Sequence, residues 1–196
     1  MPYSITEGVS RGTGANAPAV FVTPVHLEDQ IVFSAKSIAN YFLELAAASG
    51  QSISPMKLQK LVYYAHGWYS GYTDRPLINE PVEAWQYGPV IPSLYHEFKR
   101  FGSGDIQCKA FDYDALGVRE AATPSDPNVR TFLQNVFNSY GKYSGIRLSE
   151  MTHASGTPWD TTWSKCKGMR GVDIPFAEIS SYFKEAVRKS QPAAQA

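Results

Sequence analysis

Residues 54–72 read SPMKLQKLVYYAHGWYSGY, and their spacing predicts a long amphipathic helix. Ser54 and Pro55 suit the start of such a helix, because a serine oxygen can accept a backbone N–H and a first-turn proline needs no partner. Apolar side chains then recur at helical intervals along one side, at Leu58, Leu61, Val62, Ala65, Tyr69 and Tyr72. The stretch therefore predicts a helix that packs one side on a core.

Other segments with the same period flank this helix on both sides. Their expected starts are Ser34, Pro92, Asp126-Pro127, Ser144, Pro158 and Asp173-Ile174-Pro175. Glycines suited to helix ends follow three of them, at Gly50, Gly102 and Gly141. The sequence predicts a mainly α fold: a compact helical domain of about six helices with a small β-hairpin or short strand element.

Three segments depart from the helical pattern. Residues 1–32 are rich in Gly, Ala, Ser, Thr and Pro, and predict an N-terminal extension with one short strand at 20–22. Residues 103–125 have no sustained period, so we expect a variable loop with one strand, and residues 191–196 predict a disordered tail. Because a chain of 196 residues is commonly one domain, the helical domain is expected to span 33–190.

Composition limits the possible partners and compartments. Lys and Arg number 18 and Asp and Glu number 18, and this balance argues against nucleic acid, whose binding proteins usually carry a basic excess. Cys108 and Cys166 have no CxxC spacing and best fit two free thiols in a reducing cytoplasm, with one disulfide between them as the less favoured alternative. No signal peptide and no apolar run long enough to span a membrane is found. A cytoplasmic protein is expected.

Catalytic and metal-binding patterns fail on spacing. No histidine has a His or Cys three or four residues away, as zinc sites usually require; the four are His26, His66, His96 and His153. Ser155 lies near His153 without the strand-turn-helix elbow of a nucleophile. The glycines of residues 102–104 form too short a loop to hold phosphate. We expect no metal, no cofactor and no catalysis, which leaves binding as the function.

An aromatic turn is the first candidate for binding. Trp85 and Tyr87 lie two residues apart on a short strand expected over residues 82–87, so their rings would share a face. Gly88 can adopt backbone conformations closed to other residues, and Pro89 stiffens the chain that follows. The segment is either a rigid corner that packs on the helix of residues 54–72 or a preorganised contact patch.

Cationic side chains form two further candidate surfaces. On the helix that begins at Pro92, the side away from the core carries His96, Lys99 and Arg100. On the helix of residues 54–72, the side opposite the apolar stripe carries Lys57, Lys60 and Tyr64. Each set is either a solvated face or a docking surface that attracts an acidic partner.

A second motif, THASGTPW at residues 152–159, predicts structure rather than chemistry. A buried His153 can donate to a backbone carbonyl, while Thr152 bonds back within its own helix. Structural roles are therefore expected for Gly88, Pro89, Thr152, His153, Pro158 and Trp159, and likewise for His66.

Four stretches together resemble a known family. They are SAKSIANYFLELA (34–46), SPMKLQKLVYYAHGWYSGYTDRPL (54–77), PVEAWQYGPVIPSLYHEFKRFG (81–102) and LSEMTHASGTPW (148–159). In this order they resemble the Panacea domain, also called the SocA-like antitoxin domain, which occurs in phage proteins of the GepA type. The resemblance runs from about residue 34 to 163 and extends to the helix that contains residues 179–183.

The resemblance implies an antitoxin that neutralises a cognate protein toxin by direct binding, with residues 103–125 setting partner choice. One branch of the family instead delivers its toxin to a AAA+ protease, so a proteolytic adaptor is an alternative, as is a phage protein that binds a host defence factor. An enzyme built on histidines and a DNA-binding autorepressor fit the spacing and the charge less well. The identity of the toxin and the oligomeric state stay open.

Overall fold

The computed structural model describes residues 32–115, 117–166, 169 and 171–190. This part of the chain contains seven α-helices: α1 (Ala35–Ala48), α2 (Pro55–Thr73), α3 (Pro92–Phe98), α4 (Pro127–Tyr140), α5 (Gly145–Thr152), α6 (Pro158–Lys165) and α7 (Phe176–Ser190). A 3-10 helix, η1 (Lys99–Phe101), continues α3. The expected mainly helical fold is confirmed, with seven helices in place of about six. The strand expected at residues 20–22 lies outside the described residues.

Five short strands form two antiparallel sheets. They are β1 (Glu83–Trp85), β2 (Gly88–Val90), β3 (Phe111–Asp114), β4 (Gly117–Glu120) and β5 (Val172–Asp173). In the first sheet β1 lies between β2 and β5, and in the second β3 pairs with β4. Because β5 is only two residues long, the sequence pattern gave no sign of it.

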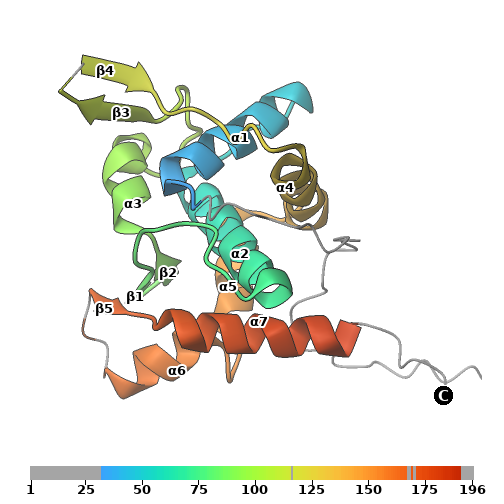
Figure 1. Cartoon of the computed structure of the whole chain (residues 1–196). Helices are drawn as coiled ribbons and strands as arrows, with labels where there is room; N and C mark the ends of the chain where they lie inside the picture. The colour runs from blue at the N-terminus through green and yellow to red at the C-terminus, as the bar shows by residue number, and fades with distance from the viewer. Residues whose placement is uncertain (1–31, 116, 167–168, 170, 191–196) are drawn as a thin grey trace, which may run out of the picture.

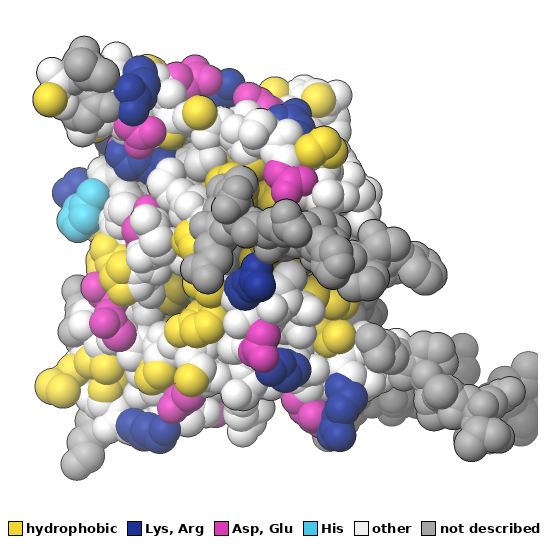
Figure 2. Space-filling model, in the orientation of Figure 1, with side chains coloured by type: hydrophobic (Ala, Val, Ile, Leu, Met, Phe, Trp, Pro, Cys, Tyr) yellow, Lys and Arg dark blue, Asp and Glu magenta, His cyan; other side chains and the backbone are white. Residues whose placement is uncertain are grey.

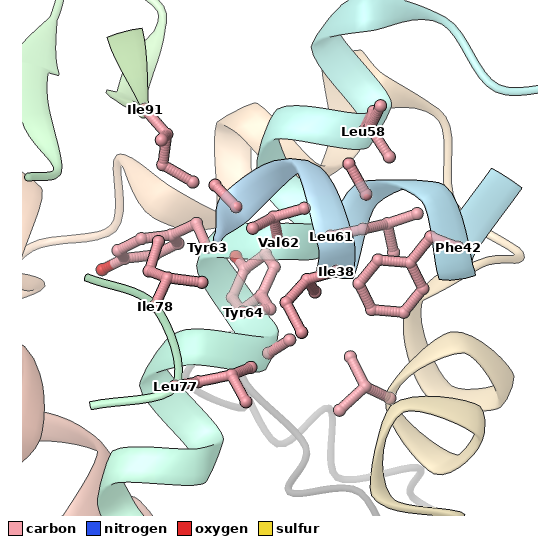
Figure 3. Close-up of a cluster of buried hydrophobic side chains, with 14 of the residues drawn as sticks. Ile38, Phe42, Leu58, Leu61, Val62, Tyr63, Tyr64, Leu77, Ile78 and Ile91 are labelled. Carbon is pink, nitrogen blue, oxygen red and sulfur yellow. The ribbon is translucent and has the colours of Figure 1, made fainter. Parts of the chain in front are cut away.

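Helix α2 lies at the centre of the molecule, with the other helices around it (Figure 1). Every residue from Leu58 to Gly71 is buried, so the apolar side is wider than the expected stripe. The reason is that α2 contacts α1, α3, α4, α5, α7 and β2. Figure 3 shows part of this core, where Ile38 and Phe42 of α1 lie beside the α2 side chains. The residues that start α2 behave as expected, since the Ser54 hydroxyl accepts the Lys57 N–H.

The contact between α2 and α7 depends on two glycines of α2. A Cβ added at Gly67 would lie 2.2 Å from Cε2 of Phe183, and one added at Gly71 would lie 2.8 Å from the Phe183 carbonyl carbon. Glycine thus lets the two helices approach closely. The Phe183 ring also meets the rings of Tyr63 and Trp68 edge-on, at 6.0 and 5.1 Å between centroids.

Residues 103–125 contain a β-hairpin in place of the expected loop with one strand. Strands β3 and β4 pair over four residues each, and every residue of β4 is exposed, so no apolar period marks it. Buried Asn40 fixes the base of the hairpin: it donates to the carbonyls of Ala110 (3.0 Å) and Ala121 (2.8 Å) and accepts the Ala110 N–H (2.7 Å).

The substitution Gly67→Ala tests the contact between α2 and α7. We expect it to lower the free energy of unfolding by about 1–3 kcal/mol, because the added methyl group overpacks the core against the Phe183 ring. Urea denaturation measures the loss. In the double variant with Phe183→Leu the two losses should be less than additive, since leucine vacates the contested space. Strict additivity would contradict the proposed clash.

Candidate functional site

The aromatic turn is a tight hairpin rather than a strand with a break after it. The chain reverses at Gln86 and Tyr87, and Trp85 pairs with Gly88 across the turn. The predicted small β-hairpin is therefore present, but the strand ends at Trp85, and the expectation that Trp85 and Tyr87 share a strand face is wrong because Tyr87 lies in the turn. The physical reason is that Gly88 takes a positive φ of 100° directly after the turn, which lets Gly88–Val90 return as β2.

Gly88 meets two constraints at once. Its positive φ, anticipated from the sequence, favours glycine. In addition, a Cβ at this position would lie 2.6 Å from the Thr152 hydroxyl and 2.9 Å from Nζ of Lys60. The hairpin backbone can pack this closely on α2 and α5 only because glycine carries no side chain.

Buried side chains from the helices hold the backbone of this hairpin. From α2, Lys60 donates its Nζ to the Pro89 carbonyl at 3.0 Å. Gln59 accepts the Ile91 N–H at 2.9 Å and donates to the Ile91 carbonyl at 3.1 Å. The Pro89 carbonyl is thereby satisfied, as are the backbone groups of Ile91 directly after β2.

Helices α5 and α6 hold the turn from the other side. Ser149 donates to the Tyr87 carbonyl at 2.7 Å, and the Trp159 indole N–H donates to the Trp85 carbonyl at 2.8 Å. We call the four side chains that bind the hairpin backbone, Gln59, Lys60, Ser149 and Trp159, the hairpin clamp. Because each bonds a main-chain group, the turn is fixed whatever side chains it carries.

Residues of the THASGTPW motif support the clamp from α5 and α6. Thr152 donates to the Ser149 carbonyl at 2.6 Å, and Thr157 donates to the Thr152 carbonyl at 2.7 Å.

His153 stands edge-on to the Trp159 ring with centroids 3.9 Å apart. Burial lowers the pKa of His153, and nearby Lys60 adds to this, while a hydrogen bond with the Gln86 backbone opposes it. Pro158 occupies the first turn of α6.

The expected exposed stripe of Lys57, Lys60 and Tyr64 is wrong for two of its members. Lys60 is 1% exposed and Tyr64 is 3% exposed, because α2 is covered on nearly all sides. The Tyr64 ring stacks on Tyr140 with centroids 4.4 Å apart. Neither side chain can touch a partner in this structure. Lys57 is partly exposed, but its Nζ is engaged by the Gly141 carbonyl at 2.6 Å.

Two buried basic groups have lowered pKa values. Burial lowers the pKa of Lys60 to about 7, since desolvation disfavours the charged form. Burial likewise lowers the pKa of His66 to about 4. His66 accepts the Ile78 N–H at its Nδ1 (3.4 Å) and lies beside the Phe176 ring, in keeping with a structural role.

The outer side of the hairpin continues into α3 as an exposed aromatic surface. Tyr87 is 63% exposed at the turn, and the half-buried Trp85 ring meets Tyr95 edge-on at 4.7 Å. Tyr95 in turn meets the exposed His96 at 5.5 Å. We call these four side chains the aromatic face. Tyr95 was missed from sequence, although its position directly after inward-facing Leu94 places it on the outer side of the helix.

Cations extend the aromatic face along α3 and η1. Lys99 and Arg100 are exposed, and within the described residues neither makes an ion pair with a carboxylate. Arg100 instead donates to Sγ of Cys108 at 2.8 Å and lies over the Phe101 ring. Figure 2 shows hydrophobic, histidine and basic side chains gathered over α3 and the first hairpin. The predicted contacts Trp85, Tyr87, His96, Lys99 and Arg100 thus occupy one region.

Within the described residues, no group of three or more His, Cys, Asp or Glu side chains could hold a metal ion. No helix among them combines the length and the apolar character needed to cross a membrane.

Comparison with known proteins identifies the family of this chain. Residues 58–160, more than half of the chain, match the family described as Antitoxin SocA-like, Panacea domain. The chain belongs to this antitoxin family. It is 36% identical over 139 residues to the antitoxin SocA of Caulobacter vibrioides (strain NA1000 / CB15N), which covers 70% of this chain and 74% of that protein. No solved structure matches the chain.

The segment that matches the Panacea domain contains the whole hairpin clamp. Gln59 and Lys60 lie near its start, Ser149 and Trp159 near its end, and the hairpin between them. The match thus spans both the supporting side chains and the turn that they support.

The pKa of Lys60 predicts how stability depends on pH. Between the folded pKa of about 7 and the ordinary value of 10.5, the unfolded chain binds a proton that the folded chain does not. The free energy of unfolding should therefore rise from pH 7 to 9, by up to about 1.4 kcal/mol per pH unit from this group. In Lys60→Met this contribution should vanish, as measured by urea denaturation at several pH values. If the free energy of unfolding rises equally with pH in both proteins, the lowered pKa of Lys60 is contradicted.

Proposed function

We propose that this protein is a cytoplasmic antitoxin that neutralises a cognate protein toxin by binding it directly, without catalysis. The observation that carries the proposal is the aromatic face on a hairpin whose backbone is fixed from behind. Membership of the antitoxin family supports a toxin as the partner.

The clamp favours binding through its effect on entropy. A surface that is ordered before binding loses little freedom when the partner arrives, so more of the contact energy appears as affinity. Tyr87 is 63% exposed, yet its backbone is held by Ser149. Trp85 and Tyr95 already contact each other. Tryptophan and tyrosine are the side chains that most often dominate protein interfaces.

The two exposed cations of η1 favour an acidic partner. Lys99 and Arg100 lie next to the aromatic face, and a carboxylate on the toxin would find them exposed. Such charges speed the approach of an oppositely charged protein and select against like-charged ones. We therefore propose that the toxin presents acidic and apolar side chains to this region.

The β3–β4 hairpin is a further part of the proposed surface. A stable interface buries about 1,200–2,000 Å² in total, more than four side chains supply. The hairpin lies beside α3, where Glu97 accepts the Phe111 N–H, so the two surfaces adjoin. Because a surface hairpin can vary while the core stays constant, we propose that residues 103–125 set partner choice.

The substitutions Trp85→Ala and Tyr87→Ala test the aromatic face. We expect each to weaken binding of the cognate toxin about 30-fold or more, the effect of losing a hot-spot side chain. Titration of the purified toxin measures this, and growth of toxin-expressing cells reports neutralisation. Met169→Ala removes an exposed apolar side chain outside the face and should change neither readout.

Circular dichroism and urea denaturation should show that both variants fold. If both bind the toxin as tightly as the unaltered protein, the aromatic face is not the interface. Growth rescue should also persist in a strain that lacks AAA+ proteases. Loss of rescue there, with binding intact, would show that the protein acts as a proteolytic adaptor.

A further inference from the structure

The outer edge of β4 carries main-chain groups that point away from the protein. In an antiparallel pair, residues that bond each other alternate with residues whose N–H and C=O face outward. The Ala121 N–H donates to the Ala110 carbonyl at 2.9 Å, and the register then makes Asp112 and Arg119 a bonded pair. Val118 therefore directs its N–H and C=O outward from the sheet.

The opposite edge of the hairpin is covered where it passes the helices. At Phe111 of β3, Glu97 accepts the outward N–H at 3.2 Å, and Lys36 donates to the outward carbonyl at 2.6 Å. In Figure 1, β3 lies between β4 and the helices, and β4 lies at the rim. Among the described residues no side chain bonds the outward groups of Val118.

An apolar pair stands on the same hairpin. Tyr113 and Val118 lie directly opposite each other, and they are 67% and 64% exposed. A strand edge with free main-chain groups and an exposed apolar side chain is a template for another strand. The hairpin is also preformed, because buried Asn40 fixes its base, so pairing would cost little ordering.

We propose that a second copy of this chain pairs with this edge, β4 against β4, antiparallel and centred on Val118. Each Val118 would then exchange two hydrogen bonds with the second copy's Val118. The apolar row would run from Tyr113 through both valines to the second copy's Tyr113. The two-fold arrangement is closed, since both copies use the same edge.

The charges of β4 select this register over the neighbouring one. With Val118 at the centre, each Arg119 lies opposite Gly117 of the second copy, which leaves room and no like charge. Shifting the centre to Arg119 would place the two arginines directly opposite each other and would set Val118 beside Glu120 of the second copy. Like charges directly opposite are destabilising in a sheet.

The expected dimer is concentration-dependent. A pair of four-residue strands buries far less than the 1,200 Å² or so of a stable interface. Association in the micromolar range or weaker is therefore expected, and the protein would shift from monomer to dimer as its concentration rises. Purified protein alone is sufficient to test this, so the outcome is separate from toxin binding.

Disulfide crosslinking tests the register. In a Cys108→Ser background, Val118→Cys should give a disulfide-linked dimer under mild oxidation, since bonded antiparallel residues lie about 5.5 Å apart between Cα atoms, within the range of a disulfide. Arg119→Cys is the matched control, because its two Cα atoms would lie about 8 Å apart. Crosslinking of residue 119 but not 118 would overturn the Val118-centred pairing, and crosslinking of neither would overturn the dimer.

Sedimentation over a range of concentrations tests the main-chain bonds. Val118→Pro removes the outward N–H without touching the bonded pairs within the hairpin, and should weaken self-association at least tenfold. Val118→Thr keeps this N–H and strand propensity, and should associate nearly as well as the unaltered protein. A monomer at every concentration, or equal association of the proline variant, would overturn the proposal.

Discussion

Hydrogen bonds from buried side chains to the hairpin backbone are the constraint on which the rest of this structure depends. A buried carbonyl without a donor costs free energy, and a three-residue strand such as β2 has few partners of its own. Gln59, Lys60, Ser149 and Trp159 supply those partners from three helices. The hairpin thus becomes part of the helical core, and α2, α5 and α6 are tied together through it.

Lys60 shows the cost of this arrangement. An ammonium group in a buried site would be expensive, and burial accordingly lowers its pKa to about 7, where a neutral amine can serve as donor. Gly88 makes this contact possible, since the absence of its side chain leaves room for Nζ of Lys60. Lys60 and Gly88 thus both serve to pack the hairpin against α2, and both are buried, whereas the side chains of the proposed aromatic face lie on the outer side.

Local chemistry made much of the fold predictable. The caps at Ser34, Ser54 and Asp126 act as anticipated, because side-chain capping depends only on nearby residues. The surroundings of α2 were not predictable in this way: its periodicity suggested one buried side, whereas helices far away in sequence cover the rest, including Lys60 and Tyr64. The β3–β4 hairpin escaped notice because its strands are exposed and its base is fixed by distant Asn40.

The hairpin clamp holds the backbone of the turn, while the exposed Tyr87 side chain has no part in holding it. Its bonds to the turn end on the carbonyls of Trp85 and Tyr87, which every amino acid possesses, and leave the Tyr87 side chain pointing to solvent. A substitution of the Tyr87 side chain therefore changes the surface that the turn presents to a partner, and it leaves the backbone hydrogen bonds of the turn intact. The identity of residue 87 is therefore free to change without loss of the hydrogen bonds that fold the turn.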